Sequence, residues 1–220
     1  MKDYLVSRKT GAVSKYGLHR RTQAVIQQLQ CFSLPKPCVL LDIGAADGLM
    51  FRSLMERFGS SSLVGVGVDV EFRYLKSAKE NVPHVVQADG RRLPLCTNSV
   101  DVIILSAVLK HIQGLEKLLL ECHRVAMPGG KVIAIDPTPW GIRLGLLLGY
   151  FTRQEIVHIM SLKDTQQVLT RCGFKVIYAG RFMLSPIPFV GSDAIEKVLG
   201  KAHLDQSFFC QVLCVEYPTG

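Results

Sequence analysis

The chain has 220 residues, of which 48% are hydrophobic and 20% are charged. This length and this apolar fraction exclude a disordered chain and a small disulfide-stapled scaffold, and they fit a single α/β domain whose strands are buried on both faces. The net charge is +8, which excludes a strongly acidic protein and is compatible with an anionic partner.

The positive charge is concentrated at the start of the chain. Before residue 22 only Asp3 opposes a set of cations, namely Lys2, Arg8, Lys9, Lys15, Arg20 and Arg21. Such an arm can hold phosphate, a membrane surface or nucleic acid, or it can be an ordinary solvated terminus. Because no apolar run follows the basic start, we expect no signal peptide and a cytoplasmic protein, soluble or peripheral to a membrane.

The seven cysteines form no Cys-x-x-Cys pair, and their odd number favours a reducing compartment over a disulfide framework. Cys122-His123 has no second ligand pair at a usable spacing. Several cysteines lie in apolar runs, where a small hydrophobic side chain would serve as well. We therefore expect a buried Cys122, no disulfide framework and no metal site.

The first predicted element is a helix that follows an irregular arm ending near residue 14. One face of this helix carries Leu18, Thr22, Val25, Leu29 and Phe32. The stretch 39–48, Val-Leu-Leu-Asp-Ile-Gly-Ala-Ala-Asp-Gly, then predicts a strand and a tight turn, and a helix follows over 49–58. A second strand over 63–68 ends in Asp69, a helix spans about 71–81, and a third strand over 85–88 ends in Asp89.

The second half of the chain continues the alternation. We predict strands over 100–105, 131–135, 174–179 and 208–216, with helices after Ile112, over 162–171 and near 190–200, and a turn over 127–130. Strands alternating with helices predict a Rossmann-like, doubly wound sheet of seven strands, mostly parallel, with helices on both faces. The last strand follows no helix at the usual spacing, so we expect it to run antiparallel.

The organisation expected from these elements is one domain over 1–220. It comprises an N-terminal arm and helix over 1–34, a cofactor-binding core over 35–136, and acceptor-side insertions over 137–161 and 180–207.

Three strands deliver acids to one edge of the predicted sheet: Asp42, Asp69 and Asp89. An acid at the end of the second strand can accept hydrogen bonds from both hydroxyls of a ribose. One such acid would be explained as a turn or helix cap, but three at successive strand ends favour a nucleoside pocket.

These residues resemble the class I S-adenosylmethionine-dependent methyltransferases, and within them the small-molecule group called type 11. The segments that carry the resemblance are Leu41–Gly48, Val66–Asp69, Gln87–Pro94, Asp101–Ile104, Leu109–Ile112 and Arg124–Lys131. The family usually has a glycine where this chain has Ala46, a small departure that still allows close approach of the backbone.

The resemblance implies S-adenosylmethionine as cofactor and S-adenosylhomocysteine as product. It places Asp42 at the cofactor's ammonium, Asp69 at the ribose and Asp89 at the adenine amino group. Tyr16 would close over the cofactor or pack at the helix entry. The remaining residues expected to line the cofactor are Gly44, Ala45, Ala46, Gly48, Val70, Gly90, Ser106 and Ala107.

Rival cofactors and substrates fit less well. A nicotinamide fingerprint needs a small residue where Leu49 stands, and the chain has neither a Tyr-x-x-x-Lys pair nor a P-loop. Methylation of DNA amino groups usually goes with an Asn/Asp-Pro-Pro-aromatic run, whereas this chain has Ser-Ala-Val-Leu at 106–109. We therefore do not expect a nucleic acid substrate, although the basic arm leaves RNA as an alternative substrate.

A general base is not required for every methyl transfer, because positioning and desolvation supply much of the rate. The first candidate is His111, just beyond the fourth strand, which could act as a base or simply order its own loop. The weaker candidates are Tyr16, His19, Asp136 and His158.

Two apolar segments, 140–151 and 182–190, could line a hydrophobic acceptor site, touch a membrane surface, form a dimer interface or be ordinary core. Residues 158–162 and 182–186 loosely resemble methyltransferases of cell-envelope glycolipid or lipid biosynthesis. We expect methyl transfer to a small, hydrophobic or lipid-like acceptor. The alternatives are an RNA or protein methyltransferase that uses the basic arm, and a cofactor-binding partner subunit without catalysis. The sequence leaves the oligomeric state open.

Overall fold

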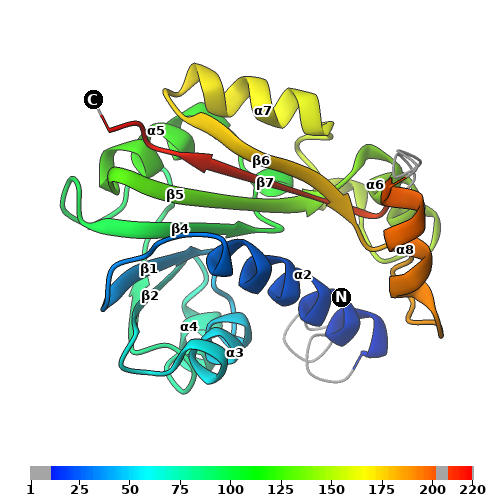
Figure 1. Cartoon of the computed structure of the whole chain (residues 1–220), viewed down its shortest axis with the longest axis horizontal. Coiled ribbons are helices and arrows are strands. Elements are labelled where there is room, and N and C mark those ends of the chain that lie inside the picture. Colours follow the sequence, from blue (N-terminus) through cyan, green and yellow to red (C-terminus); the bar gives the residue numbers. More distant parts are fainter. Residues whose placement is uncertain (1–10, 202–207, 220) are drawn as a thin grey trace.

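The computed structural model describes residues 11–201 and 208–219. The expected basic arm lies largely outside these residues, since Lys2, Asp3, Arg8 and Lys9 are not among them. The described chain forms one central sheet with helices on both faces (Figure 1). Among the described residues, no helix combines the length and the apolar character needed to cross a membrane.

The sheet has seven strands in the order β3-β2-β1-β4-β5-β7-β6. Their bounds are β1 Cys38–Ile43, β2 Leu63–Asp69, β3 His84–Gln87, β4 Val100–Ser106, β5 Ala126–Pro137, β6 Lys175–Phe182 and β7 Cys210–Glu216. β7 pairs antiparallel with both β5 and β6, and the other pairs are parallel. This confirms the predicted seven-stranded, doubly wound sheet with an antiparallel last strand.

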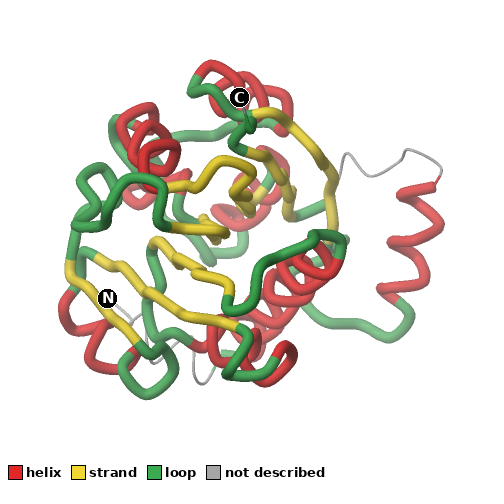
Figure 2. The backbone as a smooth tube through the Cα atoms, turned by 60° about the vertical axis from the view of Figure 1, so that its left-hand side comes forward, coloured by secondary structure: helices red, strands yellow, loops and turns green. Residues whose placement is uncertain are grey.

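The described helices are α2 Ala12–Gln30, α3 Leu49–Phe58, α4 Phe72–Ala78, α5 Leu115–Val125, α6 Pro139–Leu147, α7 Leu162–Arg171 and α8 Ser192–Lys201. Two 3₁₀ turns, η1 Leu109–His111 and η2 Arg153–Glu155, complete the connections. Figure 2, turned from the first view, shows α8 projecting from the body of the molecule.

Each face of the sheet has its own apolar core because successive strand residues point to opposite sides. Ile104 packs with residues of α2 and α3, whereas Leu105 packs with residues of α5 and α7. A glycine in the middle of β2 makes room on the first face, since a Cβ at Gly65 would lie 1.9 Å from the ring of Phe51. The close packing of α3 on β2 therefore depends on that glycine.

Several predicted boundaries differ from the structure. The turn predicted over 127–130 lies inside β5, because the backbone there remains paired with the chain after β7, as in the 2.8 Å bond from the Gly129 nitrogen to the Tyr217 carbonyl. The first helix begins earlier than expected, at Ala12, and α4 ends earlier, at Ala78.

The segment 137–161, for which the sequence predicted no regular structure, contains α6. Thr138 caps this helix by accepting from the Gly141 nitrogen at 2.9 Å, and its hydroxyl donates to the Phe208 carbonyl at 2.6 Å. A proline at the first helical position completes the start signal. The cap therefore attaches α6 to the chain that enters β7.

Candidate active site

The site lies where β1 and β4 meet, because the chain order reverses there and crossovers to opposite faces leave a crevice at the carboxyl ends of the strands. The turns after β1, β2 and β4 reach this edge together.

The turn after β1 has three residues in the left-handed region, Gly44 at φ 77°, Ala46 at 49° and Gly48 at 70°. The nitrogens of Gly44 and Ala45 both donate to the Val68 carbonyl, at 2.7 and 3.1 Å. The turn is thus fastened to the end of β2. Ala46 adopts a conformation that glycine takes more easily, which gives a physical reason for the glycine usual in the family at this place.

Asp69 connects two turns at the same edge. Its Oδ2 accepts from the Ala46 nitrogen at 3.0 Å and its Oδ1 from the Glu71 nitrogen at 2.9 Å, and the residue is 8% exposed. Capping is therefore part of its role. A carboxylate has about four acceptor positions, so each oxygen can still accept a further bond, such as one from a ribose hydroxyl.

Gly48 begins α3 in close contact with the end of α4. A Cβ there would lie 2.6 Å from Val82 and 3.0 Å from the side chain of Asn81. Asn81 in turn donates to the Asp47 carbonyl at 2.7 Å. These contacts fix the start of α3, whose backbone nitrogens face the edge.

Asp89 and Gly90 follow β3. Arg91 donates to both oxygens of Asp89, and this side-chain hydrogen bonding lowers the pKa of the carboxyl below its usual range. A Cβ at Gly90 would lie 2.8 Å from Leu118. Val70 is exposed, and its carbonyl accepts from Gln87 at 3.0 Å. Asp89 is charged and accessible, but a ligand amino group would share it with Arg91.

A small cavity of about 10 Å³ brings several predicted residues together with some that the sequence did not indicate. It is lined by Leu18, Arg21, Asp42, Gly44, Ala45, Met50 and Ser106. Asp42 is 4% exposed, and the Ser106 hydroxyl has no hydrogen-bond partner among the described residues. Leu18 and Arg21 are three residues apart in α2, so helical periodicity was the available signal for placing Arg21 on the same face as Leu18.

Tyr16 does not line that cavity. Its hydroxyl accepts from Arg20 at 2.9 Å, and Arg20 donates to both oxygens of Glu196 at 2.5 and 3.0 Å. Glu196 also accepts from the nitrogens of Met183 and Leu184. This network ties α2 to α8, and the sequence did not predict it because its members are far apart in the chain.

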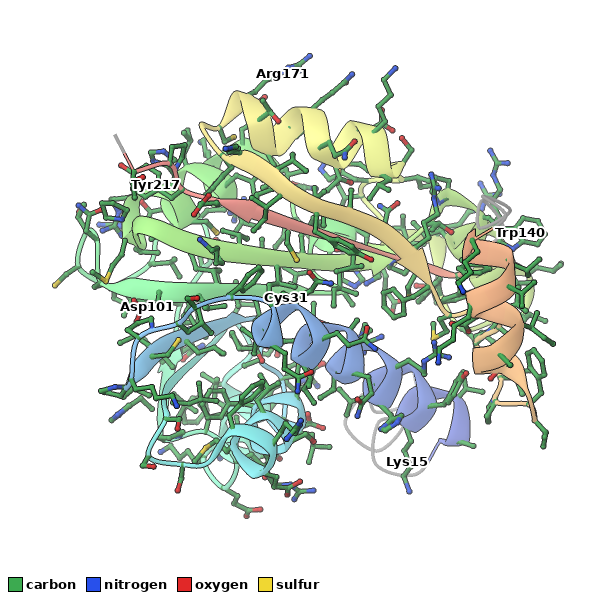
Figure 3. The ribbon with its side chains drawn as sticks, viewed as in Figure 1. Lys15, Cys31, Asp101, Trp140, Arg171 and Tyr217 are labelled. Atoms are coloured by element: carbon green, nitrogen blue, oxygen red, sulfur yellow. The ribbon has the colours of Figure 1, made fainter. Side chains whose placement is uncertain are left out.

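An apolar cluster joins the two segments predicted to line an acceptor site. Met183, Phe209 and Cys210 are buried there, with partly buried Tyr16, Leu144, Phe151 and Phe182 against them. In Figure 3, Trp140 marks the end of the molecule that carries α6 and α8, opposite the end that carries Asp101. Both segments predicted for an acceptor site therefore contribute to one cluster.

His111 ends η1 and faces the loop that carries η2. Its Nδ1 bonds to the Glu155 carbonyl, and partial burial together with the nearby charge of Lys110 lowers the pKa of the imidazole to about 4. The ring is neutral at pH 7, and if Nδ1 donates, Nε2 is the basic atom.

Each of the other candidate bases either contacts other parts of the protein or lies away from the small cavity. His158 bonds the Ile112 carbonyl at 2.9 Å and helps to dock its loop, and Asp136 is buried with Lys110. His19 lines an open groove of about 590 Å³ between α2 and α3 rather than the small cavity.

Known protein families and structures are similar to this chain in sequence and in fold. Residues 41–134 match the family model for a methyltransferase domain, Methyltransf_11. Among solved structures, a putative methyltransferase of Haloferax volcanii in complex with the Trm112 methyltransferase activator has a TM-score of 0.74 and 14% identity, over 99% of both chains. An Archaeoglobus fulgidus SAM-dependent methyltransferase has a TM-score of 0.69 and 18% identity, over 97% of this chain and all of the other. At these identities the structural likeness shows the fold.

Two curated relatives match parts of the chain. Malonyl-[acyl-carrier protein] O-methyltransferase 1 of Coxiella burnetii is 30% identical over 109 residues, 50% of this chain and 36% of the relative. The ubiquinone/menaquinone biosynthesis C-methyltransferase UbiE of Enterobacter sp. is 25% identical over 129 residues, 55% of this chain and 50% of the relative. The chain thus covers half or less of the length of each of these two.

Fold and site together define a class I, Rossmann-like methyltransferase fold. The chain contains a class I S-adenosylmethionine-dependent methyltransferase domain, centred on residues 41–134.

Proposed function

We propose that this protein transfers the methyl group of S-adenosylmethionine to a small hydrophobic or lipid-like acceptor and releases S-adenosylhomocysteine. The observation that carries the proposal is that the cleft at the ends of β1, β2 and β4 and the apolar cluster around Met183 lie at the same edge of the sheet. The relatives named for malonyl-[acyl-carrier protein] and for quinone biosynthesis support an acceptor of this kind.

In this proposal the cofactor lies along the turns after β1, β2, β3 and β4. Asp42 holds the ammonium of the methionine part, Asp69 and Val70 the ribose, and Asp89 and Gly90 the adenine. The backbone of the turn over 44–48 approaches the methionine part, and that of 106–107 borders the sulfonium. Arg21, which lines the same cavity as Asp42 and Ser106, supplies a cation for the methionine carboxylate.

The acceptor binds on the side of the Met183 cluster, where apolar side chains exclude water from an in-line displacement at the methyl carbon. Tyr16 closes this side through its bond to Arg20. His111 is the proposed base, and its neutral ring at pH 7 can accept a proton from an acceptor. Where the acceptor is already nucleophilic, positioning alone suffices.

Exposed apolar side chains around the acceptor side support a lipid-like partner or a membrane surface. The large hydrophobic side chains exposed in α6, α8 and the segments beside them are Trp140, Leu147, Leu148, Ile187, Phe189, Val190, Ile195 and Val198. Exposed cations in α6 and α8, Arg143, Lys197 and Lys201, suit an anionic lipid surface.

Two cations of the basic arm are directed toward the protein rather than outward. Arg20 pairs with Glu196, and Arg21 lines the small cavity. Their placement favours the small-acceptor function over use of the arm for RNA or for a protein substrate.

The test is transfer of label from methyl-labelled S-adenosylmethionine to acceptors. The expected result is label in the organic phase when lipid extract or soluble quinone and acyl precursors are supplied, and loss of that label in Asp69→Ala. Label that enters only RNA or protein side chains, and not an acyl group carried by a protein, would contradict the proposed acceptor class. The matched control is Asp101→Ala, which removes another acid that caps a backbone nitrogen, that of Val39 at 2.8 Å.

A further inference from the structure

A buried pair of charges lies beneath the turn after β4. Lys110 is 5% exposed and Asp136 is 6% exposed, with 3.7 Å between Nζ and Oδ1. The Lys110 ammonium also lies 5.8 Å from the centre of the Phe151 ring. Burying two charges is costly even when they are paired, so such a pair beside an active-site edge invites a functional explanation.

The strongest contact of Lys110 is with the backbone. Its Nζ donates to the Ala107 carbonyl at 2.6 Å, and the Ala107 nitrogen donates to the Ile135 carbonyl at 2.6 Å. Ala107 has φ 61°, in the left-handed region that alanine adopts only at a cost. A residue stays in that region where its surroundings hold it, and here both of its backbone polar groups are held.

Ala107 lies between one residue that packs on the turn after β1 and another that lines the small cavity. The next residue, Val108, packs directly on the turn after β1, since a Cβ at Gly44 would lie 2.5 Å from its Cγ2. The preceding residue, Ser106, lines the small cavity with Gly44 and Asp42. A displaced Ala107 would therefore move groups that face both turns of the cleft.

We propose that Lys110 is a positioning residue, which through the Ala107 carbonyl holds the turn after β4 in the conformation that completes the cofactor cleft against Gly44. Asp136 supplies the counter-charge and fixes η1, because its Oδ2 accepts from the Leu109 nitrogen at 3.1 Å. The assignment rests on the proposed function in taking this cleft as the S-adenosylmethionine site.

The titratable or charged groups around Lys110 come from four elements: Asp136 on β5, Arg21 on α2, Cys210 on β7 and the neighbouring His111 on η1. Burial lowers the pKa of Lys110, Asp136 raises it in part, and Arg21 lowers it further. Burial raises the pKa of the Cys210 thiol to about 12, so this group stays neutral in ordinary buffers. As the pH rises through the lowered pKa of Lys110, the ammonium is lost, and cofactor affinity is expected to fall.

The test is a double-mutant cycle on binding of S-adenosylhomocysteine, measured by calorimetry with wild type, Lys110→Met, Ala107→Gly and the double variant. Lys110→Met is expected to weaken binding about ten-fold. In that background Ala107→Gly is expected to restore about three-fold or more, because glycine takes the left-handed conformation without help. A general loss of packing at Lys110 would not be relieved in this way.

The assignment is overturned if Lys110→Met keeps the wild-type circular dichroism and the wild-type affinity. It is also overturned if Ala107→Gly changes binding equally in both backgrounds. A wild type that binds no S-adenosylhomocysteine would overturn both the assignment and the proposed function, whereas unaffected variants beside a binding wild type overturn the assignment alone.

Should Lys110→Met not fold, Asp136→Asn gives the second measurement, since the amide oxygen can still accept from Leu109 while the counter-charge is gone. The alkaline fall in S-adenosylhomocysteine affinity is then expected at lower pH than in wild type. A pH profile identical to that of wild type would overturn the assignment.

Discussion

The two halves of the sheet edge are built differently. On the half proposed to bind the cofactor (the cofactor half), the turns after β1, β2 and β3 are held by backbone donors and by acids close to them in the chain or on a neighbouring parallel strand, as with Asp69 and Ala46. On the half proposed to bind the acceptor (the acceptor half), α6 and α8 are attached by side chains that bridge long stretches of sequence, such as Arg20 to Glu196 and Thr138 to Phe208.

Under the proposed function, this difference corresponds to a division of work. Turns held by the backbone offer one geometry, which suits a cofactor that never changes. Helices held by a few polar links around an apolar cluster can be altered without disturbing those turns, which suits the part proposed to select the acceptor. Changes to the two halves should therefore have separable effects on stability and on binding.

The largest effect on stability is expected on the cofactor half, from Gly48→Val. The added side chain meets Val82 at 2.6 Å in a backbone with φ 70°, so the free energy of unfolding should fall by at least about 3 kcal/mol. The matched control is Gly149→Val, where φ is 72° but nothing lies within 4 Å, with an expected cost of about 1 to 2 kcal/mol from the backbone conformation alone. Equal losses in urea unfolding would show that the contact with Val82 and Asn81 is unimportant.

A smaller effect is expected on the acceptor half, from Glu196→Gln. The side chains of Arg20 and Glu196 are only 15% and 9% exposed, so removing one charge should cost about 2 kcal/mol. Binding of S-adenosylhomocysteine should change much less than in Asp69→Ala. Glu56→Gln breaks an exposed pair with Arg52 and should cost less than about 0.5 kcal/mol. Thermal unfolding of both variants measures the contrast, and matching losses would contradict the account of the α2–α8 link.

The smallest effect on the free energy of unfolding is expected from the titration of His111. Its pKa is lowered to about 4 from 6.5, so the unfolded chain takes up this proton at higher pH than the folded protein does. Stability should fall as the pH drops from about 6.5 to about 4, by about 1 kcal/mol once solvent screening of this exposed residue is allowed for. In His111→Gln, the free energy of unfolding, measured with urea at several pH values, should depend less steeply on pH in this range. An unchanged pH dependence would show that it comes from other groups.

The cofactor half could be predicted from the sequence because its signals are local. The apolar runs ending in Asp42 and Asp69, and the small residues between them, specify strands, turns and a helix within a single crossover. The place of Ala46 in the left-handed region was not predicted, since an alanine gives no such signal.

For the acceptor half, the sequence predicted apolar character but not the arrangement of the helices. The start of α6 depends on the hydrogen bond from Thr138 to the Phe208 carbonyl, and the position of α8 depends on the pairing of Glu196 with Arg20. Contacts between such distant residues have no periodicity. For the same reason the buried pairing of Lys110 with Asp136 emerged only from the fold.

The most direct test of the central claim is calorimetric titration of wild type, Asp69→Ala and Asp101→Ala with S-adenosylmethionine and S-adenosylhomocysteine. Both acids cap a backbone nitrogen, but only Asp69 lies at the proposed cofactor cleft. The account predicts binding to wild type, a loss of ten-fold or more in Asp69→Ala, about 1.4 kcal/mol, and little change in Asp101→Ala. Absence of binding to folded wild type, or equal losses in both variants, would contradict it.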